Sequence, residues 1–596
     1  MPFILKSLLL LLLSPLFLAA GSTPAPEDHT ELVSALDSRI PALASEWNVP
    51  GIAVAIVKNG TVVFEKGFGF KDRERQLPVT PQTLFAIGST TKAFTTFVMG
   101  TLYDEKKLDW DTPIVTYLPS FQLYDSAVSG RVTPRDLACH RTGVPRHDLL
   151  WVNSNLTRPQ LAYRLRYLPN TDDLRAKWQY NNLMYAAAGY LIEEITHRTW
   201  EDAVRDRIFT PLGMSSSTFS VKDSSQDLAC AYEKRDDAVL RVPYRDIQNI
   251  GPAGSINSCL ADLIPWVMLH LNDGVYKGHR LIQSSTLKDI HAPHMLLSPS
   301  EISGVETLGY GLGWVIENYR GHRRVWHDGG IDGFTAAISL IPEENIGIIV
   351  LTNMGDTPLP YILTHEITDR ILKLSFCDWN TEWAQRVKSA EKSLKEERHN
   401  KELLRKTGTT PSHPIHEYAG EYEHPGYGTV TIAQNNDALL MTYNGITTPL
   451  RHWHYDVFAA HAAPTGDQAH AQAKLLFQND LAGDICAVEI PMEPTVANII
   501  FTKKPSVDLC TPAYLRRFVG VYGSDTTPFT VTMDGETLLL KSDGEEAEEC
   551  IPKTANTFTS KKPPSRTVKF AVDNRGIATE AQIETENGVV RAPRRQ

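Results

Sequence analysis

A short aromatic pattern occurs twice in the C-terminal third of the chain. Residues 418–422 read Tyr-Ala-Gly-Glu-Tyr, and residues 518–522 read Phe-Val-Gly-Val-Tyr. Each copy is followed by a few residues that alternate between polar and apolar, as in a half-buried strand. A period this long is typical of tandem domains rather than of a solenoid. We therefore predict two separate β modules, the first at residues 414–505 and the second at residues 512–596.

The first two-thirds of the chain mixes strand and helix patterns. An Asn-Gly pair at residues 59–60 separates two apolar runs, which is a strong signal for a β-hairpin. A second pair of apolar runs, 335–341 and 346–351, predicts another hairpin. Helical patterns such as residues 183–195 lie between the two hairpins. This order predicts an α+β domain over residues 28–375, with an antiparallel sheet and a mostly helical insert.

A charged segment joins this domain to the β modules. Residues 381–406 are crowded with Lys, Arg and Glu and contain few apolar side chains. That pattern predicts a solvent-exposed helix followed by a flexible linker, which together cover residues 376–413.

The N-terminus has the pattern of a secretory signal peptide. Lys6 precedes an apolar stretch of roughly 13 residues that ends in small residues. A membrane-spanning helix needs about 20 apolar residues, so this stretch is too short. We therefore expect residues 1–21 to be cleaved, the mature protein to be secreted (extracellular or periplasmic) and no stable membrane anchor to remain. In a eukaryotic host, the sequons at Asn59 and Asn155 would be glycosylation sites.

Composition and missing motifs exclude several classes of protein. Hydrophobic residues make up 42% of the chain and charged residues 22%, which is ordinary for a globular protein. The net charge of −11 argues against a nucleic-acid partner, since nucleic-acid-binding proteins usually have a basic face. Residues 365–369 differ from the zinc-protease motif H-E-x-x-H at its last position, and the chain has neither a P-loop nor a G-x-S-x-G nucleophile elbow. The sequence therefore implies no metal and no organic cofactor.

The motif S-x-x-K, in which a lysine can activate a serine, occurs three times. The copies that begin at Ser285 and Ser389 lie on expected surface helices. The copy at Ser89 and Lys92 instead opens a strongly apolar helical pattern, where both side chains point the same way. A helix N-terminus also stabilises negative charge. A lysine acts as a base only when it is neutral, which burial or a nearby cation would favour.

A Y-x-N motif supplies further polar groups for such a site. It occurs once in the chain, at residues 180–182, just before a helical pattern. Tyr180 can exchange protons beside the lysine, and the amide of Asn182 can hold a substrate carbonyl.

Two segments could provide the third element, a basic residue followed by x-Gly on an edge strand facing the serine. Residues 406–408 read Lys-Thr-Gly, but they follow the hydrophilic linker and have no strand pattern around them. His327 and Gly329 lie just before the second predicted hairpin and are preferred as substrate-binding residues. The amide of Gly330, together with that of Ser89, would then form the oxyanion hole.

S-x-x-K, Y-x-N and H-x-G in this order resemble the penicillin-binding-protein and class C β-lactamase family of serine hydrolases. The resemblance covers about residues 30–375 and implies that Ser89 is the nucleophile and Lys92 its base. It assigns Tyr180 as the partner acid or base and Asn182 as a substrate ligand, and it leaves open which of the two proton carriers is the main base. Further stretches that look like the family are residues 137–140, 143–145, 251–254, 309–314 and 327–334, together with Asp262.

His327 departs from the β-lactamase pattern, which usually has a lysine at this position. A histidine, with an ordinary pKa of about 6.5, is mostly neutral at pH 7. A substrate that lacks a carboxylate therefore becomes more plausible. H-x-G followed by two β modules resembles D-aminopeptidases, whose C-terminal domains are lipocalin-like antiparallel barrels.

The resemblance implies a serine hydrolase that forms an acyl-enzyme with small-molecule or peptide amides or esters, including those that contain D-amino acids, and the N-terminal pattern implies that it is secreted. Esterases of the same superfamily remain close alternatives. An acyltransferase or transesterase of this superfamily would share the first half of the reaction, so the motifs do not separate the two. A non-catalytic binding protein that keeps the fold is the third alternative. The oligomeric state is not indicated by the sequence.

Overall fold

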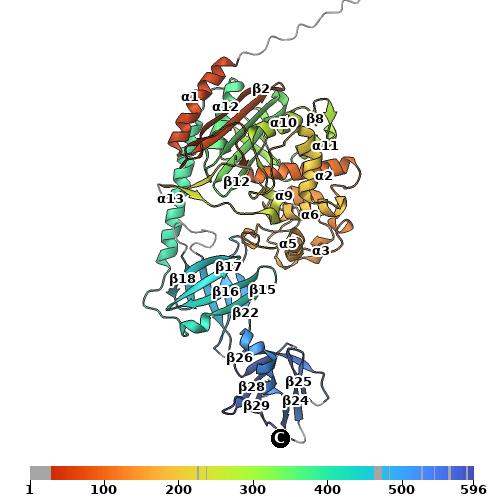
Figure 1. Cartoon of the computed structure of the whole chain (residues 1–596), viewed down its shortest axis with the longest axis vertical. Helices are drawn as coiled ribbons and strands as arrows, with labels where there is room; N and C mark the ends of the chain where they lie inside the picture. The colour runs from red at the N-terminus through yellow and green to blue at the C-terminus, as the bar shows by residue number, and fades with distance from the viewer. Residues whose placement is uncertain are drawn as a thin grey trace, which may run out of the picture.

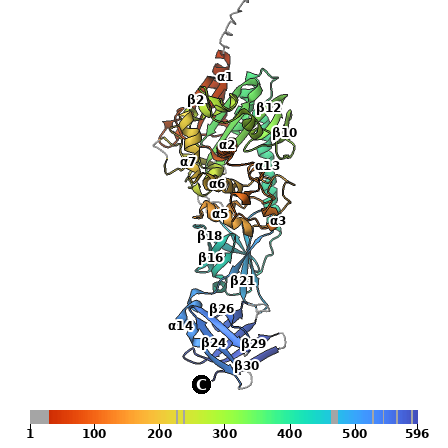
Figure 2. The ribbon, with the colours of Figure 1, turned by 90° about the vertical axis from the view of Figure 1, so that its right-hand side faces the viewer.

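The computed structural model of the 596-residue chain describes residues 29–223, 227–235, 238–461, 473–481, 483–524, 528–542, 544–561, 566–585 and 588–595. The predicted signal peptide, residues 1–21, lies outside the described residues. Three bodies follow one another along the long axis, a mixed body of helices and strands first and two β bodies after it (Figure 1, Figure 2). In the described part of the chain, every helix is too short or too polar to span a bilayer.

An eight-stranded antiparallel sheet forms the centre of the first body. Its strands, in spatial order, are β10 (Val305–Tyr310), β11 (Val315–Tyr319), β12 (His322–Ile331), β13 (Phe334–Ile341), β14 (Ile346–Thr352), β1 (Gly51–Lys58), β2 (Thr61–Asp72) and β3 (Leu77–Pro78). Both predicted hairpins are present, as β1–β2 and β13–β14. β1 also pairs with β14, from Ile52↔Thr352 to Lys58↔Ile346, so the two hairpins meet in the middle of the sheet.

Helices cover both faces of this sheet. The helices of the first body are α1 (Thr30–Glu46), α2 (Thr91–Asp104), α3 (Ser126–Ser129), α4 (Pro134–Ala138), α5 (Arg158–Arg164), α6 (Asn182–Thr196), α7 (Trp200–Val204), α8 (Thr210–Leu212), α9 (Gly251–Gly254), α10 (Leu260–Leu271), α11 (Ser284–Ile290) and α12 (Leu359–Ile371). The odd-numbered side chains of β1 between residues 53 and 57 pack into a core shared with α2, α6 and α10. The even-numbered side chains between residues 52 and 56 pack against α1 and α12. Burial on both faces explains why this strand is apolar without alternation.

The helical insert lies between β3 and β10 in the sequence, with α2 at its centre. All residues of α2 from Thr91 to Leu102 are buried. Three small sheets support the insert: β4 (Phe85–Ala86) with β7 (Asn257–Ser258), β5 (Ala231–Arg235) with β6 (Ala238–Val242), and β8 (Val275–Tyr276) with β9 (His279–Arg280). The other two S-x-x-K serines, Ser285 on α11 and Ser389 further along the chain, are exposed. Only the copy on α2 therefore lies at a buried helix.

A long helix, α13 (Trp379–Leu403), leads from the first body to the first β body (Figure 1). It is formed by the charged segment, and Trp379 is its one buried residue. The Trp379 indole N–H donates a hydrogen bond of 2.7 Å to Asp369 on α12, which holds the start of the helix against the first body.

The two β bodies each contain eight antiparallel strands. β15–β22 form a closed barrel: β15 (Gly420–His424), β16 (Gly428–Asn435), β17 (Ala438–Tyr443), β18 (Ile446–His454), β19 (Val457–Ala460), β20 (Lys474–Asn479), β21 (Ile485–Ile490) and β22 (Ile499–Lys503). The second body follows in the same sequential order: β23 (Gly520–Gly523), β24 (Pro528–Asp534), β25 (Thr537–Ser542), β26 (Glu548–Thr554), β27 (Thr557–Ser560), β28 (Thr567–Val572), β29 (Ala578–Thr585) and β30 (Gly588–Pro593). A bridge between Tyr522 and Arg594 brings its ends together. The predicted α+β domain followed by two small antiparallel barrels is confirmed.

The repeated aromatic pattern makes the same contact at the start of both barrels. The hydroxyl of Tyr422 donates a hydrogen bond of 2.8 Å to the carbonyl of Tyr418. The hydroxyl of Tyr522 donates one of 2.7 Å to the carbonyl of Phe518. All four rings are buried. In each copy of the repeat, this hydrogen bond therefore stabilises the turn that leads into the first strand of the barrel.

The first barrel packs directly on the first body. His147 joins the two, since its ring hydrogen-bonds to the Tyr427 hydroxyl at 2.7 Å and its main-chain N–H donates to Glu493 at 3.1 Å. The Asn444 amide donates to the carbonyl of Leu149 at 3.2 Å. The buried core of this barrel is continuous with that of the first body, whereas the second barrel has a core of its own. These contacts fix the loop between β21 and β22, which carries Glu493, close to the helical insert.

Candidate active site

Ser89 lies in a turn of 3₁₀ helix, Gly88–Thr90, at the entrance to α2. Gly88 has a left-handed φ of 51°, which lets the chain turn sharply from β4 into the helix. A Cβ atom on Gly88 would lie 2.8 Å from the amide nitrogen of Gly330, so this turn also needs glycine to approach β12.

Lys92 contacts the serine from one turn further along α2. Its Nζ lies 3.0 Å from Ser89 Oγ, 2.9 Å from Asn182 Oδ1 and 2.8 Å from the carbonyl of Ala253. The side chain is fully buried, and desolvation, followed by the charge of Arg146, holds its pKa well below the usual range of lysine. A neutral amine has two N–H bonds and one lone pair. The two carbonyl oxygens match the N–H bonds, which leaves the lone pair for the Ser89 hydroxyl.

Tyr180 completes a proton-transfer path on the other side of the serine. Its hydroxyl shares a hydrogen bond with Ser89, and Lys92 Nζ lies 4.6 Å from the centre of its ring. Burial raises the pKa of Tyr180 above the usual range, so the phenol is protonated. The arrangement therefore offers a neutral amine that can take a proton and a phenol that can give one.

Both polar atoms of the Asn182 side chain are hydrogen-bonded to other protein side chains. Its Oδ1 accepts from Lys92, and its Nδ2 donates to Asp148 at 3.0 Å. The carboxamide thus holds the lysine in place, and the predicted contact with substrate stays a prediction. Sequence reasoning passed over Asn181, whose Oδ1 caps α6 and whose Nδ2 donates to the carbonyls of Val144 and Pro145. These bonds fix the backbone next to Tyr180.

His327 lies where β12 becomes an edge strand. β11 pairs with β12 only as far as Trp326, so from His327 onward that side of β12 faces the turn that carries Ser89. The His327 Nδ1–H donates to the Asp328 carbonyl at 2.5 Å, and Nε2 accepts from the Tyr310 hydroxyl at 2.8 Å. Burial lowers the pKa of His327, so the ring is neutral and supplies no positive charge.

Gly329 and Gly330 offer a matched pair of substitutions. A Cβ atom on Gly329 would lie 1.9 Å from the carbonyl oxygen of Ile87, whereas one on Gly330 meets no atom within 4 Å. We expect Gly329→Ala to push the Ser89 turn off β12, lowering both the melting temperature and kcat. Gly330→Ala should fold with an unchanged melting temperature, because its methyl group would enter open space. Thermal unfolding and steady-state kinetics of both variants check this, and equal melting temperatures would show that the turn tolerates the displacement.

Several of the predicted site residues line one cavity of about 780 Å³. Its lining residues are Ser89, Pro145, Arg146, Thr171, Asp172, Lys177, Trp178, Gln179, Tyr180, Tyr310, Val315, His327, Asp328, Gly330, Glu493 and Thr495. The structure thus brings Ser89, Tyr180, His327 and Gly330 to one cavity, with Lys92 beneath it. Glu493 and Thr495 come from the first barrel. Sequence reasoning missed these two, because no motif marks a loop that reaches the site from another domain.

Neither arginine near the site supplies a free positive charge. Arg141 donates to Asp136 at 2.6 Å and to the carbonyl of His294 at 2.9 Å. Arg146 lies over the Tyr180 ring, 5.1 Å from its centre, and pairs with Asp148 at 2.7 Å. A substrate carboxylate would therefore have to compete with a carboxylate of the protein for Arg146.

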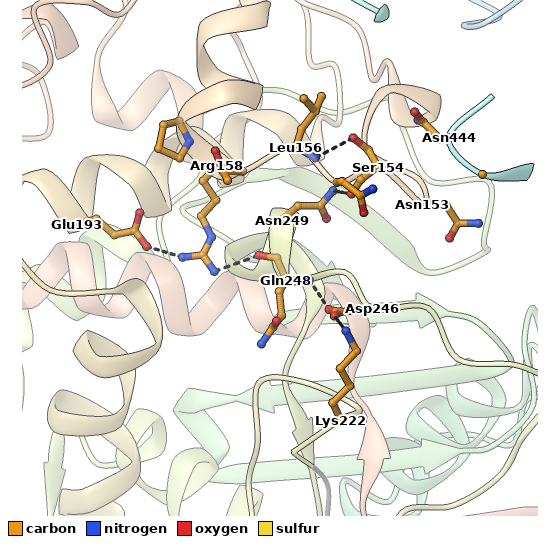
Figure 3. Close-up of a pocket in the computed structure, with 14 residues that line it drawn as sticks. Asn153, Ser154, Leu156, Arg158, Glu193, Lys222, Asp246, Gln248, Asn249 and Asn444 are labelled. Carbon is orange, nitrogen blue, oxygen red and sulfur yellow. Dashed lines mark hydrogen bonds and ion pairs between the residues drawn. The ribbon is translucent and has the colours of Figure 1, made fainter. Parts of the chain in front are cut away.

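A second hollow, of about 710 Å³, lies between the helical insert and the first barrel (Figure 3). Its charges are paired within its own wall, Arg158 with Glu193 and Lys222 with Asp246.

The sequon residue Asn155 is exposed at the rim of this hollow, and the other sequon residue, Asn59, is exposed in the turn between β1 and β2. Both asparagines are accessible for modification. In the part of the chain that the structure describes, no group of three or more His, Cys, Asp or Glu side chains could hold a metal ion.

Comparison with known proteins identifies similar chains. Residues 36–366 match the family model described as Beta-lactamase, and residues 404–503 match a domain of unknown function, DUF3471. The chain is 32% identical over 447 residues to the unguisins hydrolase ungD′ of Aspergillus campestris, covering 70% of this chain and 79% of that protein. It is 28% identical over 531 residues to the unguisins hydrolase ungD of Aspergillus violaceofuscus, covering 80% and 90%.

One solved structure shares the fold over most of the chain. It is the octameric penicillin-binding protein homologue from Pyrococcus abyssi, with a TM-score of 0.53 and 21% identity, covering 78% of this chain and 99% of that one. The family match includes Ser89, Lys92, Tyr180 and His327 in a single segment. Because this match spans more than half of its residues, the chain belongs to the beta-lactamase family, as a serine hydrolase.

Proposed function

We propose that this serine hydrolase is secreted and cleaves peptide-like amides and esters that carry no carboxylate at the position recognised by β-lactamases. The observation that carries the proposal is the contact set of Lys92. In the neutral amine, two carbonyl oxygens take the two N–H bonds, which leaves the lone pair for Ser89 Oγ, 3.0 Å from Nζ. The neutral ring of His327 supports the choice of substrate, because burial lowers the pKa of this side chain and it offers no positive charge to a carboxylate.

The chemistry follows from these positions. Lys92 Nζ takes the Ser89 proton as Oγ attacks the substrate carbonyl carbon. The amides of Ser89 and Gly330 would stabilise the oxyanion that forms. The proton then passes by way of Tyr180 to the leaving nitrogen or oxygen, and the C–N or C–O bond breaks. Water attacks the acyl-enzyme by the reverse sequence, which returns the proton to Ser89 and releases the acid.

The relatives support a hydrolytic reaction, since two similar proteins are named unguisins hydrolases. Their fungal origin supports a eukaryotic host, in which the exposed sequons at Asn59 and Asn155 would be glycosylated. The N-terminal pattern over residues 1–21 supports secretion. The alternative function, transfer of the acyl group to an amine or alcohol, begins with the same formation of an acyl-enzyme. The experiment below also measures this transfer.

The experiment uses the full chain expressed in a filamentous fungus. Mass spectrometry of the secreted protein should show an N-terminus after residue 21 and a mass that falls on glycosidase treatment. Paired substrates with the same cleavable bond are then compared by kcat/KM: one of each pair has a free carboxylate away from that bond, and the other has this carboxylate converted to an amide. We expect the substrate without the free carboxylate to react faster. Added amines should divert little of the product. A preference for the free acids would contradict the substrate proposal, and a predominantly aminolysed product would favour the transferase.

A further inference from the structure

Asp328, the middle residue of the H-x-G motif, projects a carboxylate into the wall of the active-site cavity. Its side chain is 41% exposed, and the Tyr361 hydroxyl donates a hydrogen bond of 2.8 Å to its Oδ2. Tyr361 lies on α12 and is itself held, because its ring stacks on Trp383 at 5.0 Å and meets Trp326 edge-on at 6.0 Å. The carboxylate is therefore fixed by a tyrosine anchored outside the cavity.

The other charged side chains in this wall already have partners. Arg146 pairs with Asp148, and Lys177 lies 3.7 Å from Asp172. Glu493 accepts hydrogen bonds from the main-chain N–H of His147 and from Thr495, which commits both of its oxygens.

Asp328 differs from all of them. Among the described residues, no lysine or arginine lies within ion-pair distance of Asp328. Its nearest basic group is His327 Nδ1, 3.8 Å from Oδ1, whose hydrogen is already donated to a carbonyl. The Asp328 side chain thus lines the cavity with no lysine or arginine paired to it among the described residues.

We propose that Asp328 is a specificity-determining residue that binds a cationic group of the substrate, such as an ammonium group, within the cavity that holds Ser89. This inference rests on the proposed hydrolase function and names the charge of its preferred substrates. An ion pair at a preoriented carboxylate is favoured over one between two mobile side chains, because Tyr361 has already fixed the acceptor. Tyr361 acts as a positioning residue in this arrangement.

The same contact would also act on catalysis. Asp328 raises the pKa of Lys92, as Asp148 does, whereas Arg146 lowers it. Asp328 also raises the pKa of Tyr180. A substrate cation paired with Asp328 would offset both effects, so Lys92 would stay neutral and Tyr180 would release its proton more readily. A cationic substrate should therefore gain in kcat as well as in KM.

Three p-nitrophenyl esters test the proposal with one acyl chain length. The 6-aminohexanoyl, heptanoyl and pimeloyl esters end in an ammonium, a methyl and a carboxylate group, and the flexible chain lets each end reach the wall of the cavity. We expect the wild type to prefer the ammonium ester. Asp328→Asn should lower the ratio of kcat/KM for ammonium over methyl about ten-fold, which corresponds to about 1.4 kcal/mol. The ratio for carboxylate over methyl should rise in the same variant.

Asp172→Asn is the matched control, because it removes a carboxylate of the same cavity that already has a lysine partner. Its ratio should stay close to that of the wild type, and a fall equal to that of Asp328→Asn would assign the preference to the overall charge of the cavity. Equal ratios in Asp328→Asn and wild type would overturn the proposal.

Two further measurements cover other outcomes. If Asp328→Asn fails to fold, inhibition of the wild type by 6-aminohexanamide and heptanamide is compared, and equal inhibition constants would overturn the proposal. If the wild type cleaves none of the three esters, the hydrolase proposal fails. If it cleaves the esters but shows no charge preference, only the role of Asp328 fails.

Discussion

Replacing Ser89 by alanine should lower kcat by about 10⁴- to 10⁶-fold, the range seen when the nucleophile of a serine hydrolase is removed. Among the described residues, Ser89 Oγ is the one hydrogen-bond partner of Lys92 Nζ that can attack a carbonyl, since the other two partners are carbonyl oxygens. The fold should survive, because the side chain is only partly buried and its loss leaves no cavity in the core. Steady-state kinetics and the loss of covalent labelling by an acylating probe measure the effect.

The chain offers its own controls for this variant. Ser285 and Ser389 begin the other two S-x-x-K motifs, and both are exposed on α11 and α13. Ser285→Ala and Ser389→Ala should keep the kinetics and the labelling of the wild type. Turnover that persisted in purified Ser89→Ala, or labelling lost in either control, would place the nucleophile elsewhere.

Replacing Lys92 by alanine should lower the acylation rate by about 10²- to 10⁴-fold, which is the usual contribution of a positioned general base. Lys92→Arg is the informative companion, because arginine keeps a positive charge and stays protonated in proteins. It has no lone pair for the Ser89 proton. We expect both variants to be similarly slow in single-turnover measurements. An active Lys92→Arg would show that the lysine acts as a charge and not as a base.

Tyr180→Phe tests the second half of the same proton path. Removing the hydroxyl leaves the ring that packs near Lys92, so the fold should be kept. If Tyr180 and Lys92 pass one proton between them, the double variant should be hardly slower than the slower single variant. Fully additive losses would show that the two residues act in separate steps.

Residue chemistry determined how much of the site could be predicted. Ser89, Lys92, Tyr180 and His327 could be selected as candidates because each belongs to a short local motif, S-x-x-K, Y-x-N or H-x-G. Asp328 is the middle residue of the third motif, but the motif does not show that its carboxylate is held in place. That depends on a hydrogen bond from Tyr361, which lies on α12. No local pattern in the sequence reports such a contact.

The fold shows the same division. The two hairpins and the repeated aromatic-x-Gly-x-Tyr pattern are local signals, and both predicted the right elements. That the core of the first barrel runs into the first body, with Glu493 at the site, is a matter of long-range packing. The hydrogen bonds of the Asn182 side chain likewise join it to Asp148 and Lys92, which lie 34 and 90 positions away.

The pairing of β1 with β14 has a consequence for how this protein is made. β1 leaves the ribosome early and can pair with β2 along one edge, yet the partner of its other edge, β14, begins only at Ile346. At about 5–20 residues per second, the apolar edge of β1 waits unpaired for a time on the order of tens of seconds. Such a strand is a template for aggregation until it is covered. Yields in a heterologous host should therefore depend on chaperones and on low growth temperature more than on the stability of the finished molecule.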